Sequence, residues 1–330
     1  MSALRVLEWV RDPAGIWNMP EATVAELARE FPDVRFDDPA TREERDARLP
    51  LADVVLGYAL SPRNFASARR VRWVHSTAAG VGHVLFPELI ESPVIVTNSR
   101  GLHAHSMAEQ VLGMMLAFTR RLHVSRDLQT ARRWAQAELW RASPGFEELA
   151  GATLGLVGFG RIGGAIATAA RPFGMRVLAV RRHPRPDPAP ADEQWGTERL
   201  GDLLERSDWV VLAAPHTGET DRLIGRAELA RMKPTARLVN VARGALVDEE
   251  ALIEALREGR LAGAALDVAQ TEPLPPESPL WTMPEVILTP HTSGAGPRFW
   301  ERVREQFAGN LRRFLAGQPL ENVVDKRGGY

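Results

Sequence analysis

Short apolar runs alternate with amphipathic stretches along the first hundred residues. The apolar runs cover residues 4–10, 52–56 and 71–76, and residues 21–31 have the mixed polar and apolar spacing of a helix. Apolar runs of strand length separated by helical stretches are typical of an α/β layer with a parallel sheet. We therefore predict such a layer for the N-terminal part of the chain.

A second series of apolar runs begins near residue 153. Its predicted strands are residues 153–157, 176–180, 209–214, 237–241, 263–268 and 285–289. Six strands with helices between them make a complete doubly wound unit. The predicted fold class is therefore α/β, with two doubly wound domains in one chain.

Two amphipathic stretches connect these layers. Residues 105–134 have apolar side chains at helical spacing and predict one long helix that carries the chain from one domain to the other. Residues 297–315 predict a helix that follows the last strand and folds back onto the first domain. This connectivity would leave a cleft between the domains.

The composition narrows the classes of function. The 330 residues include 41 Lys and Arg against 42 Asp and Glu, so the net charge favours neither nucleic acid nor an anionic membrane. Cysteine is absent, which excludes disulfides and Cys-ligated metal, and we expect no metal site. No apolar run has membrane-spanning length, and the N-terminal stretch alternates charged with apolar residues. We expect a cytoplasmic protein whose partner is a small molecule.

A glycine-rich motif follows the first strand of the second series. Gly158, Gly160 and Gly163, with Arg161 and Ile162 between the last two, stand between the run 153–157 and a helical stretch. In a dinucleotide-binding turn the first glycine permits a tight turn, the second lets the backbone approach a pyrophosphate, and the third lets helix and strand pack closely. The alternative is a glycine-rich turn that binds no ligand.

The end of the second strand indicates which dinucleotide is bound. An acidic residue there normally takes the ribose hydroxyls of NAD, but this chain has Arg181 and Arg182. Guanidinium groups suit the 2′-phosphate of NADP, so we predict that NADP(H) is preferred and that NAD(H) can also be used. The alternative is a solvated basic turn.

Three polar residues follow strand ends of the second series, where ligands of open α/β sheets bind. Arg243 can bind a carboxylate and polarise a carbonyl, and His291 can protonate the carbonyl oxygen as hydride arrives. Glu272 beside His291 would orient the ring and favour its protonated form. Each residue taken singly also fits a salt bridge or an exposed loop. His216 follows another strand end and would lie near the cofactor.

The order of these motifs resembles the D-isomer-specific 2-hydroxyacid dehydrogenase family over nearly the whole chain. The matching stretches are residues 79–81, 106–109, 158–163, 240–244, 247–249, 266–268, 272–273 and 289–291. The Arg181–Arg182 pair resembles the NADP-using glyoxylate and hydroxypyruvate reductases of this family. One departure is His83, at a place where many members have Asp or Asn.

The resemblance implies roles for these positions. Arg243, Glu272 and His291 fall on the catalytic positions. Backbone amides of Ala79, Gly80 and Val81 would bind the substrate carboxylate, and exposed amides of such a loop can form an anion nest. Positions expected to bind the cofactor, in addition to the glycine motif with Arg161 and Ile162, the arginine pair and His216, are Met107, Pro215, Ala242 and Asp267.

The resemblance also implies a domain arrangement and an assembly. Residues 1–101 completed by 294–330 would form a flavodoxin-like substrate domain. Residues 102–293 would form a Rossmann cofactor domain that begins with the linking helix. The family would imply a homodimer built on that helix. The expected reaction moves a hydride between NAD(P)H and a small 2-oxo or 2-hydroxy acid.

Two other functions share this architecture. In formate dehydrogenases, as the resemblance implies, Gln pairs with the catalytic histidine. This chain has Glu272 instead, which argues against a formate dehydrogenase. Transcriptional corepressors that resemble the family use the fold as a nucleotide-sensing scaffold. Corepressors carry extra partner-binding segments that this sequence lacks. Turnover of NADPH with a 2-oxo acid distinguishes an enzyme from such a scaffold.

Overall fold

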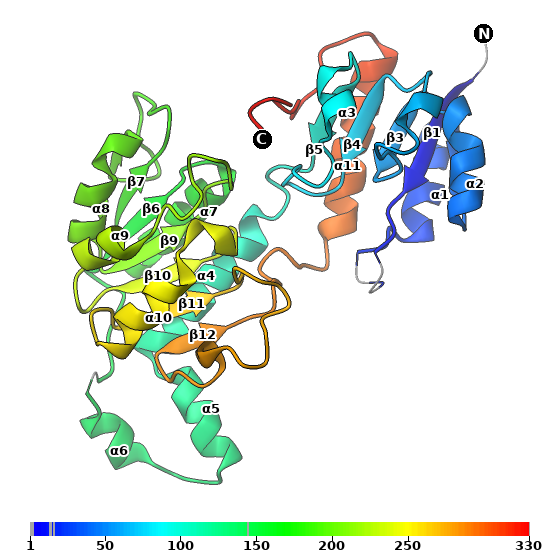
Figure 1. The fold of residues 1–330 in the computed structure, drawn as a ribbon. Helices are drawn as coiled ribbons and strands as arrows, with labels where there is room; N and C mark the ends of the chain where they lie inside the picture. The colour runs from blue at the N-terminus through cyan, green and yellow to red at the C-terminus, as the bar shows by residue number, and fades with distance from the viewer. Residues whose placement is uncertain (1–2, 13–14, 16, 144, 330) are drawn as a thin grey trace. The chain divides into compact units, whose positions relative to one another are not determined.

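The computed structural model of the protein describes residues 3–12, 15, 17–143 and 145–329, and the chain forms two compact units (Figure 1). Unit 1 comprises Met1–Leu102 and Gly296–Tyr330, and unit 2 comprises His103–Ala295. The sequence placed these divisions after residues 101 and 293. The last segment of the chain therefore belongs to the same unit as the first.

Unit 1 is built on a parallel sheet with the strand order β2-β1-β3-β4-β5. This is the flavodoxin-like order of a doubly wound fold, as predicted. The strands are β1 (Leu4–Trp9), β2 (Val34–Asp37), β3 (Val54–Gly57), β4 (Trp73–Ser76) and β5 (Ile95–Asn98). The helices are α1 (Glu21–Glu30), α2 (Arg42–Arg48), α3 (Pro87–Glu91) and α11 (Phe299–Leu315).

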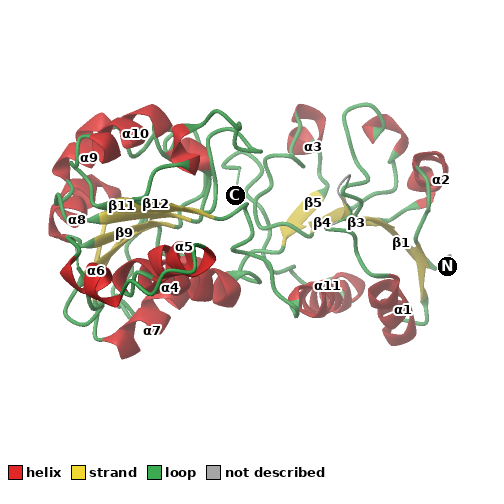
Figure 2. Ribbon diagram, turned by 90° about the horizontal axis from the view of Figure 1, so that it is seen from below, coloured by secondary structure: helices red, strands yellow, loops and turns green. Residues whose placement is uncertain are grey.

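Helices cover both faces of this sheet, with α1 and α11 on one side and α2 and α3 on the other (Figure 2). The α11 side is held by aromatic packing, because the ring of Phe307 stacks on Trp73 of β4 with centroids 5.0 Å apart. Both side chains are fully buried. Fully burying a side chain of this size contributes about 1.5–3 kcal/mol, so α11 is an integral part of the unit 1 core.

Unit 2 has a parallel sheet with the order β12-β11-β10-β9-β6-β7-β8 in the part of the chain that the structure describes. The reversal between β9 and β6 is the switch point of a Rossmann sheet. The strands are β6 (Thr153–Val157), β7 (Arg176–Val180), β8 (Glu193–Trp195), β9 (Trp209–Leu212), β10 (Arg237–Asn240), β11 (Gly263–Leu266) and β12 (Val286–Leu288). The helices are α4 (Ala104–Thr119), α5 (Leu122–Thr130), α6 (Gln136–Arg141), α7 (Arg161–Ala170), α8 (Leu200–Arg206), α9 (Arg226–Arg231) and α10 (Glu249–Arg257).

Two layers of helices sandwich the unit 2 sheet. α4 and α7 lie on one face, and α8, α9 and α10 lie on the other (Figure 2). The inner strands β6, β9, β10 and β11 are almost entirely buried, as expected for a parallel sheet covered on both faces, and the edge strands β8 and β12 are partly exposed. Because every strand runs in the same direction, the carboxyl ends of all seven meet at one edge.

The prediction of one long helix over residues 105–134 is wrong. The chain forms α4 and α5 with a break at Arg121, whose φ of 51° is left-handed. In a continuous helix the Arg121 amide would bond to Ala117, but it donates to Phe118 instead. The Ala117 carbonyl oxygen instead accepts a hydrogen bond from Nδ1 of His123 at 3.0 Å. A side-chain hydrogen bond therefore ends α4, and periodicity alone did not reveal it.

The second correction concerns strand number. The sequence predicted six strands in unit 2, and the structure adds the edge strand β8. In unit 1 the apolar runs predicted β1, β3 and β4 but missed β2 and β5. The missed strands are only three or four residues long and carry polar residues, such as Thr97 and Asn98 of β5, so none of them is marked by four or more consecutive apolar residues.

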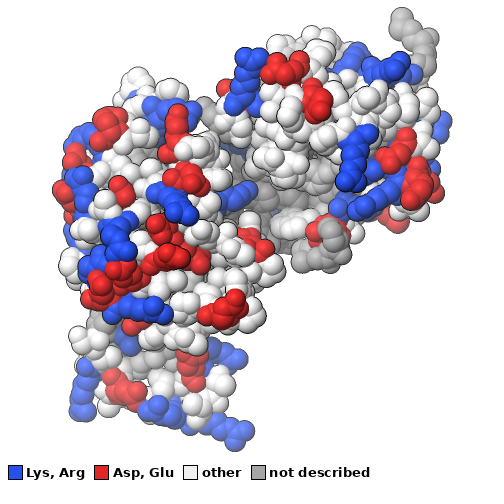
Figure 3. All heavy atoms as spheres, viewed as in Figure 1, with Lys and Arg blue, Asp and Glu red and all other residues white. Residues whose placement is uncertain are grey.

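Positive and negative side chains are interspersed over the face seen in Figure 3. This mixture agrees with the nearly balanced charge of the sequence. None of the helices that the structure describes has the length and apolar character needed to cross a membrane.

Candidate active site

The glycine motif forms the turn between β6 and α7. Gly158 has a φ of 96°, and a Cβ there would lie 2.6 Å from the Ala214 amide nitrogen. A Cβ on Gly163 would lie 2.4 Å from the Gly158 carbonyl oxygen. Both positions therefore require glycine because neighbouring backbone leaves no room for a side chain.

Gly160 differs from the other two glycines, because a Cβ there would meet no described atom within 4 Å. It is the N-cap of α7, and no side chain caps this helix. The amides of the first turn of a helix lack intrahelical acceptors and attract anions. An open space in front of uncapped amides fits the pyrophosphate of a dinucleotide, so the residues present suit this cofactor.

The arginine pair lies at the carboxyl end of β7, next to β6 in the sheet. Nη1 of Arg181 is buried and has no hydrogen-bond partner among the described residues. Burial, and then the like charge of Arg185, lower the pKa of the Arg181 guanidinium. A bound anion would relieve both effects. Arg182 is more exposed, and its Nη2 forms an ion pair with Glu219 at 2.6 Å.

The loop after β9 reaches the glycine turn. Gly158 packs against the backbone of Ala213 and Ala214, directly before Pro215 and His216. Nε2 of His216 lies 2.9 Å from Oδ1 of Asp221, and both side chains are substantially exposed. The structure therefore brings this loop beside the predicted pyrophosphate site, where β6 and β9 are neighbours.

A buried carboxylate organises the loop that carries His291. Asp267 follows β11, and its Oδ1 accepts hydrogen bonds from Thr289 Oγ1 at 2.6 Å and from the Thr292 amide at 2.9 Å. Oδ2 accepts from the Ser293 amide at 3.0 Å. The carboxylate is only 1% exposed, so these bonds fix the loop with little competition from water. Asp267 therefore positions residues 289–293.

His291 has a left-handed φ of 53°. Its amide donates to the Asp267 carbonyl oxygen at 2.7 Å and to the Thr289 carbonyl oxygen at 3.0 Å. A non-glycine residue in this conformation costs about 1–2 kcal/mol, which the surrounding hydrogen bonds offset. The local backbone therefore presents the imidazole at the carboxyl edge of the sheet.

His291 and Glu272 form a hydrogen-bonded pair. Nδ1 of the ring lies 2.7 Å from Oε2 of Glu272, and the other carboxylate oxygen accepts from the Ala269 amide at 3.1 Å. Because a carboxylate accepts, Nδ1 carries a proton, which leaves Nε2 to face a reacting group. Both side chains are partly exposed, so the pair is accessible from solvent.

The loop after β10 carries Arg243, whose side chain is exposed and whose Nη1 donates to the Ala242 carbonyl oxygen at 2.6 Å. Asn240 holds this loop from within the sheet. Its side-chain Nδ2 donates to the Arg243 carbonyl oxygen at 2.9 Å, and its Oδ1 accepts from the Ala242 amide at 3.0 Å. Asn240 is almost completely buried.

Gly244 joins the Arg243 loop to the Glu272 loop. A Cβ on Gly244 would fall within 2.0 Å of the Ala269 carbonyl group, so only glycine permits this approach. Ala269 is the residue whose amide binds Glu272. Neither Asn240 nor Gly244 was among the predicted site residues. Both lie in the stretch 240–244 that resembles the family, which was the signal available in the sequence.

The remaining predicted cofactor residues of unit 2 take varied positions. Met107 is buried in the cluster that also contains Phe159, and Ile162 packs against the same cluster. Arg161 is exposed at the start of α7, and Ala242 is buried beside Arg243. A direct cofactor contact for each of these residues stays a prediction.

In unit 1, Ala79, Gly80 and Val81 follow β4. Among the described residues, the amides of these three have no hydrogen-bond acceptor, whereas the carbonyl oxygens of Ala78 and Ala79 both accept hydrogen bonds. The Ala79 carbonyl oxygen accepts from Asn98 Nδ2 at 2.6 Å, and the Ala78 carbonyl oxygen accepts from the Ser99 amide at 3.1 Å. These hydrogen bonds fix the carbonyl groups of the loop, and the amides of Ala79, Gly80 and Val81 stay available to an anion.

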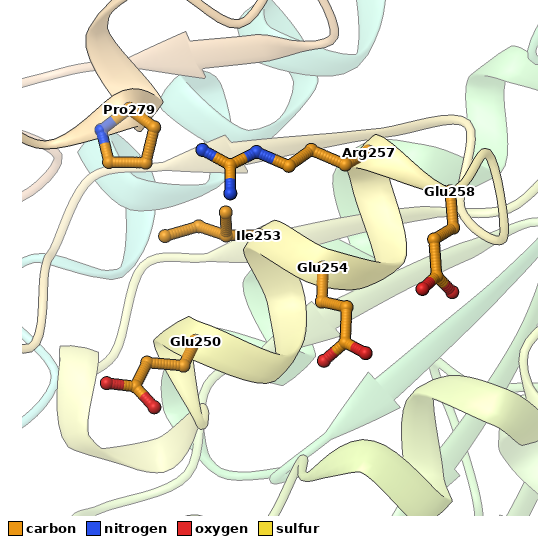
Figure 4. Close-up of a pocket in the computed structure, with 6 residues that line it drawn as sticks. All are labelled: Glu250, Ile253, Glu254, Arg257, Glu258 and Pro279. Atoms are coloured by element: carbon orange, nitrogen blue, oxygen red, sulfur yellow. The ribbon is translucent and has the colours of Figure 1, made fainter.

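A surface hollow elsewhere in unit 2 contains none of these residues. It is lined by the outer side of α10, by the residue that follows this helix, Glu258, and by Pro279 (Figure 4). Glu254 there is paired with Arg226. Among the described residues, no group of three or more His, Asp or Glu side chains is placed to bind a metal ion.

Comparison with known proteins identifies the family of the chain. Residues 112–293 match the family described as D-isomer specific 2-hydroxyacid dehydrogenase, NAD binding domain. A glyoxylate reductase of Korarchaeum cryptofilum is 34% identical over 316 residues, which cover 94% of each chain.

Solved structures extend the match to both units. A D-isomer specific 2-hydroxyacid dehydrogenase family protein of Aeromonas salmonicida is 33% identical, with a TM-score of 0.83 over 98% of this chain and 100% of that one. An NADPH-dependent glyoxylate/hydroxypyruvate reductase of Sinorhizobium meliloti is 27% identical, with a TM-score of 0.81 over 99% of this chain and 100% of that one. The chain therefore belongs to the D-isomer specific 2-hydroxyacid dehydrogenase family and is an NAD(P)-dependent oxidoreductase of 2-hydroxy acids.

Proposed function

We propose that the protein reduces small 2-oxo acids of the glyoxylate and hydroxypyruvate class, that NADPH is its preferred cofactor, and that His291, Glu272 and Arg243 are its catalytic residues. The observation that carries the assignment is the 2.7 Å pair between His291 and Glu272 at the carboxyl edge of the unit 2 sheet. The relatives described as glyoxylate reductases support the substrate class.

His291 is the proton donor in this proposal. When bound, the nicotinamide supplies the hydride that the carbonyl carbon receives. His291 in its protonated form gives the Nε2 proton to the carbonyl oxygen, which becomes the hydroxyl of the product. Nδ1 keeps its proton and its hydrogen bond to Glu272. The carboxylate stabilises the charged ring before transfer and fixes its orientation.

Arg243 supplies a permanent positive charge at the same edge of unit 2. Its guanidinium can polarise the substrate carbonyl and bind a neighbouring carboxylate oxygen. The unengaged amides of Ala79, Gly80 and Val81 in unit 1 are proposed to bind the substrate carboxylate. We name residues 78–81 the anion loop.

The preference for NADPH rests on Arg181. Its buried Nη1 without a described partner and its lowered guanidinium pKa fit a place that accepts the 2′-phosphate. The reductase of Sinorhizobium meliloti, which is described as NADPH-dependent, supports this assignment.

A substrate panel tests the proposed function. Initial rates with NADPH are measured for glyoxylate, hydroxypyruvate and pyruvate, beside acetaldehyde and acetone as uncharged carbonyl compounds of similar size. We expect the 2-oxo acids to be reduced far more efficiently, because the uncharged compounds cannot bind the anion loop or Arg243. An uncharged ketone reduced as efficiently as glyoxylate would show that anion recognition is wrongly assigned.

The same panel separates an enzyme from a nucleotide-sensing scaffold. A corepressor-like protein would bind NADPH with negligible turnover of every compound. Cofactor affinity is therefore measured in parallel by the quenching of tryptophan fluorescence. Tight binding without turnover would favour the scaffold.

Glu272→Gln tests the acid and base roles. The substitution removes the negative charge 2.7 Å from the His291 ring and weakens the hydrogen bond that fixes its orientation. Reduction needs the charged ring in that orientation, so kcat for glyoxylate should fall by about tenfold or more, with NADPH affinity nearly unchanged. Wild type and variant are compared in the same buffer. An unchanged kcat would remove Glu272 from the mechanism.

We also propose that the chain forms a homodimer through the segment of α5 and α6. This segment extends beyond the rest of unit 2 (Figure 1), and it exposes 94% of Trp134 and 78% of Trp140. Large exposed aromatic side chains favour a protein interface. Sedimentation velocity should show a dimer that Trp134→Glu weakens, and a concentration-independent monomer in wild type would contradict the assignment.

A further inference from the structure

A fully buried histidine in unit 1 takes no part in the chemistry described so far. His75 lies on β4, three residues before the anion loop, and is 0% exposed. Its Nδ1 lies 2.8 Å from Oγ1 of Thr97 on the neighbouring strand β5. The same hydroxyl oxygen lies 2.8 Å from the indole Nε1 of Trp73.

The donors and acceptors in this cluster have one consistent arrangement. The indole N–H of Trp73 can only donate, so Thr97 Oγ1 accepts from it and its own proton is directed to Nδ1 of His75. Burial lowers the pKa of His75 to about 3, so the ring is neutral and its single proton is on Nε2. Nε2–H then donates toward Ser99 Oγ at 3.4 Å.

Ser99 carries the chain of hydrogen bonds to the main chain. Its hydroxyl donates to the Ser76 carbonyl oxygen at 3.1 Å, and its amide donates to the Ala78 carbonyl oxygen. Ser76 is the last residue of β4, and Ala78 begins the anion loop. The hydroxyl of Ser76 accepts from the Ala78 amide at 3.3 Å. The buried network therefore ends on the backbone that orients the loop.

We propose that His75 is a positioning residue for substrate binding, which, through Ser99 and Ser76, holds the anion loop with its amides directed at the substrate carboxylate. This inference rests on the proposed function, because it assumes that the loop binds a 2-oxo acid. The ring acts only through its two nitrogens, one accepting and one donating, and it transfers no proton.

Two substitutions break the network at different places. His75→Phe keeps an aromatic ring and removes both nitrogens. Ser99→Ala removes the hydroxyl but keeps the hydrogen bond from the backbone amide of residue 99 to the Ala78 carbonyl oxygen. Each should raise KM for glyoxylate about tenfold, the effect of one lost buried hydrogen bond, with kcat and NADPH affinity nearly unchanged. His75→Gln, whose side-chain amide offers an acceptor and N–H donors, should keep part of the glyoxylate affinity that His75→Phe loses.

Val96→Ala is the matched control for stability. Val96 is also buried on β5, but its side chain lies on the other face of the sheet from Thr97. It should lower the melting temperature without raising KM. The inference is overturned if folded His75→Phe and Ser99→Ala keep the wild-type KM, or if Val96→Ala raises KM by the same factor.

Binding of oxamate, an unreactive analogue of a 2-oxo acid, is measured by calorimetry for the same proteins in the presence of NADPH. Wild type that binds oxamate but reduces no 2-oxo acid would contradict the proposed function and leave the loop assignment standing. Equal oxamate affinity in wild type, His75→Phe and Ser99→Ala would contradict the role of His75 alone. A loss of oxamate affinity in both variants, with partial recovery in His75→Gln, supports it.

Discussion

His291→Ala is expected to lower kcat for glyoxylate reduction by about two to four powers of ten, the usual contribution of a general acid. The variant loses the imidazole that follows β12 and pairs with Glu272, which is the proposed proton donor. NADPH affinity should persist, because the glycine turn and Arg181 are untouched. Stopped-flow rates under single-turnover conditions measure the chemical step directly.

His123→Ala is a suitable comparison for that experiment. This histidine lies in α5, where its ring bonds to the Ala117 carbonyl oxygen at the end of α4. It does not follow a strand of the unit 2 sheet. It should affect thermal stability more than kcat. If His291→Ala kept more than about a tenth of the wild-type single-turnover rate, general-acid catalysis by this residue would be ruled out.

Arg181→Asp is expected to invert the cofactor preference. The variant removes a guanidinium that can form charge-assisted hydrogen bonds to the 2′-phosphate, each worth about 1.5–3 kcal/mol. It also places a negative charge against that phosphate, and an acid at this position suits the ribose hydroxyls of NAD. The ratio of Kd for NADH to Kd for NADPH should fall by about a hundredfold or more.

The charge change itself needs a control, and Arg171→Asp supplies one. Arg171 is exposed, and its side chain donates to the Pro190 carbonyl oxygen, away from the end of β7. In this variant the ratio of Kd for NADH to Kd for NADPH should stay near the wild-type value. The wild-type preference should weaken with salt, because the contact is charged and partly exposed. Equal wild-type affinities for the two cofactors would contradict the assignment of Arg181 to the 2′-phosphate.

Local patterns in the sequence determined the fold class and pointed to the edge of the sheet where the candidate site lies. The six apolar runs of unit 2 correspond to six of its strands, and residues 153–157 and 176–180 match β6 and β7 at both ends. Parallel strands buried on both faces have to be continuously apolar, so these elements are visible without tertiary information. The glycine spacing around Gly160 and the polar residues after strand ends were visible for the same local reason.

Tertiary structure decided how those residues meet. Glu272 and His291 are 19 positions apart, and their hydrogen bond depends on Asp267 anchoring the His291 loop and on Gly244 admitting the backbone of Ala269. Periodicity could not predict the end of α4, because the bond that caps it comes from His123 in the next helix. The buried network of His75 was equally hidden, since it joins two strands that only the folded sheet brings together. Contacts between residues distant in the chain leave no periodic signal, and these contacts fix the geometry of the site.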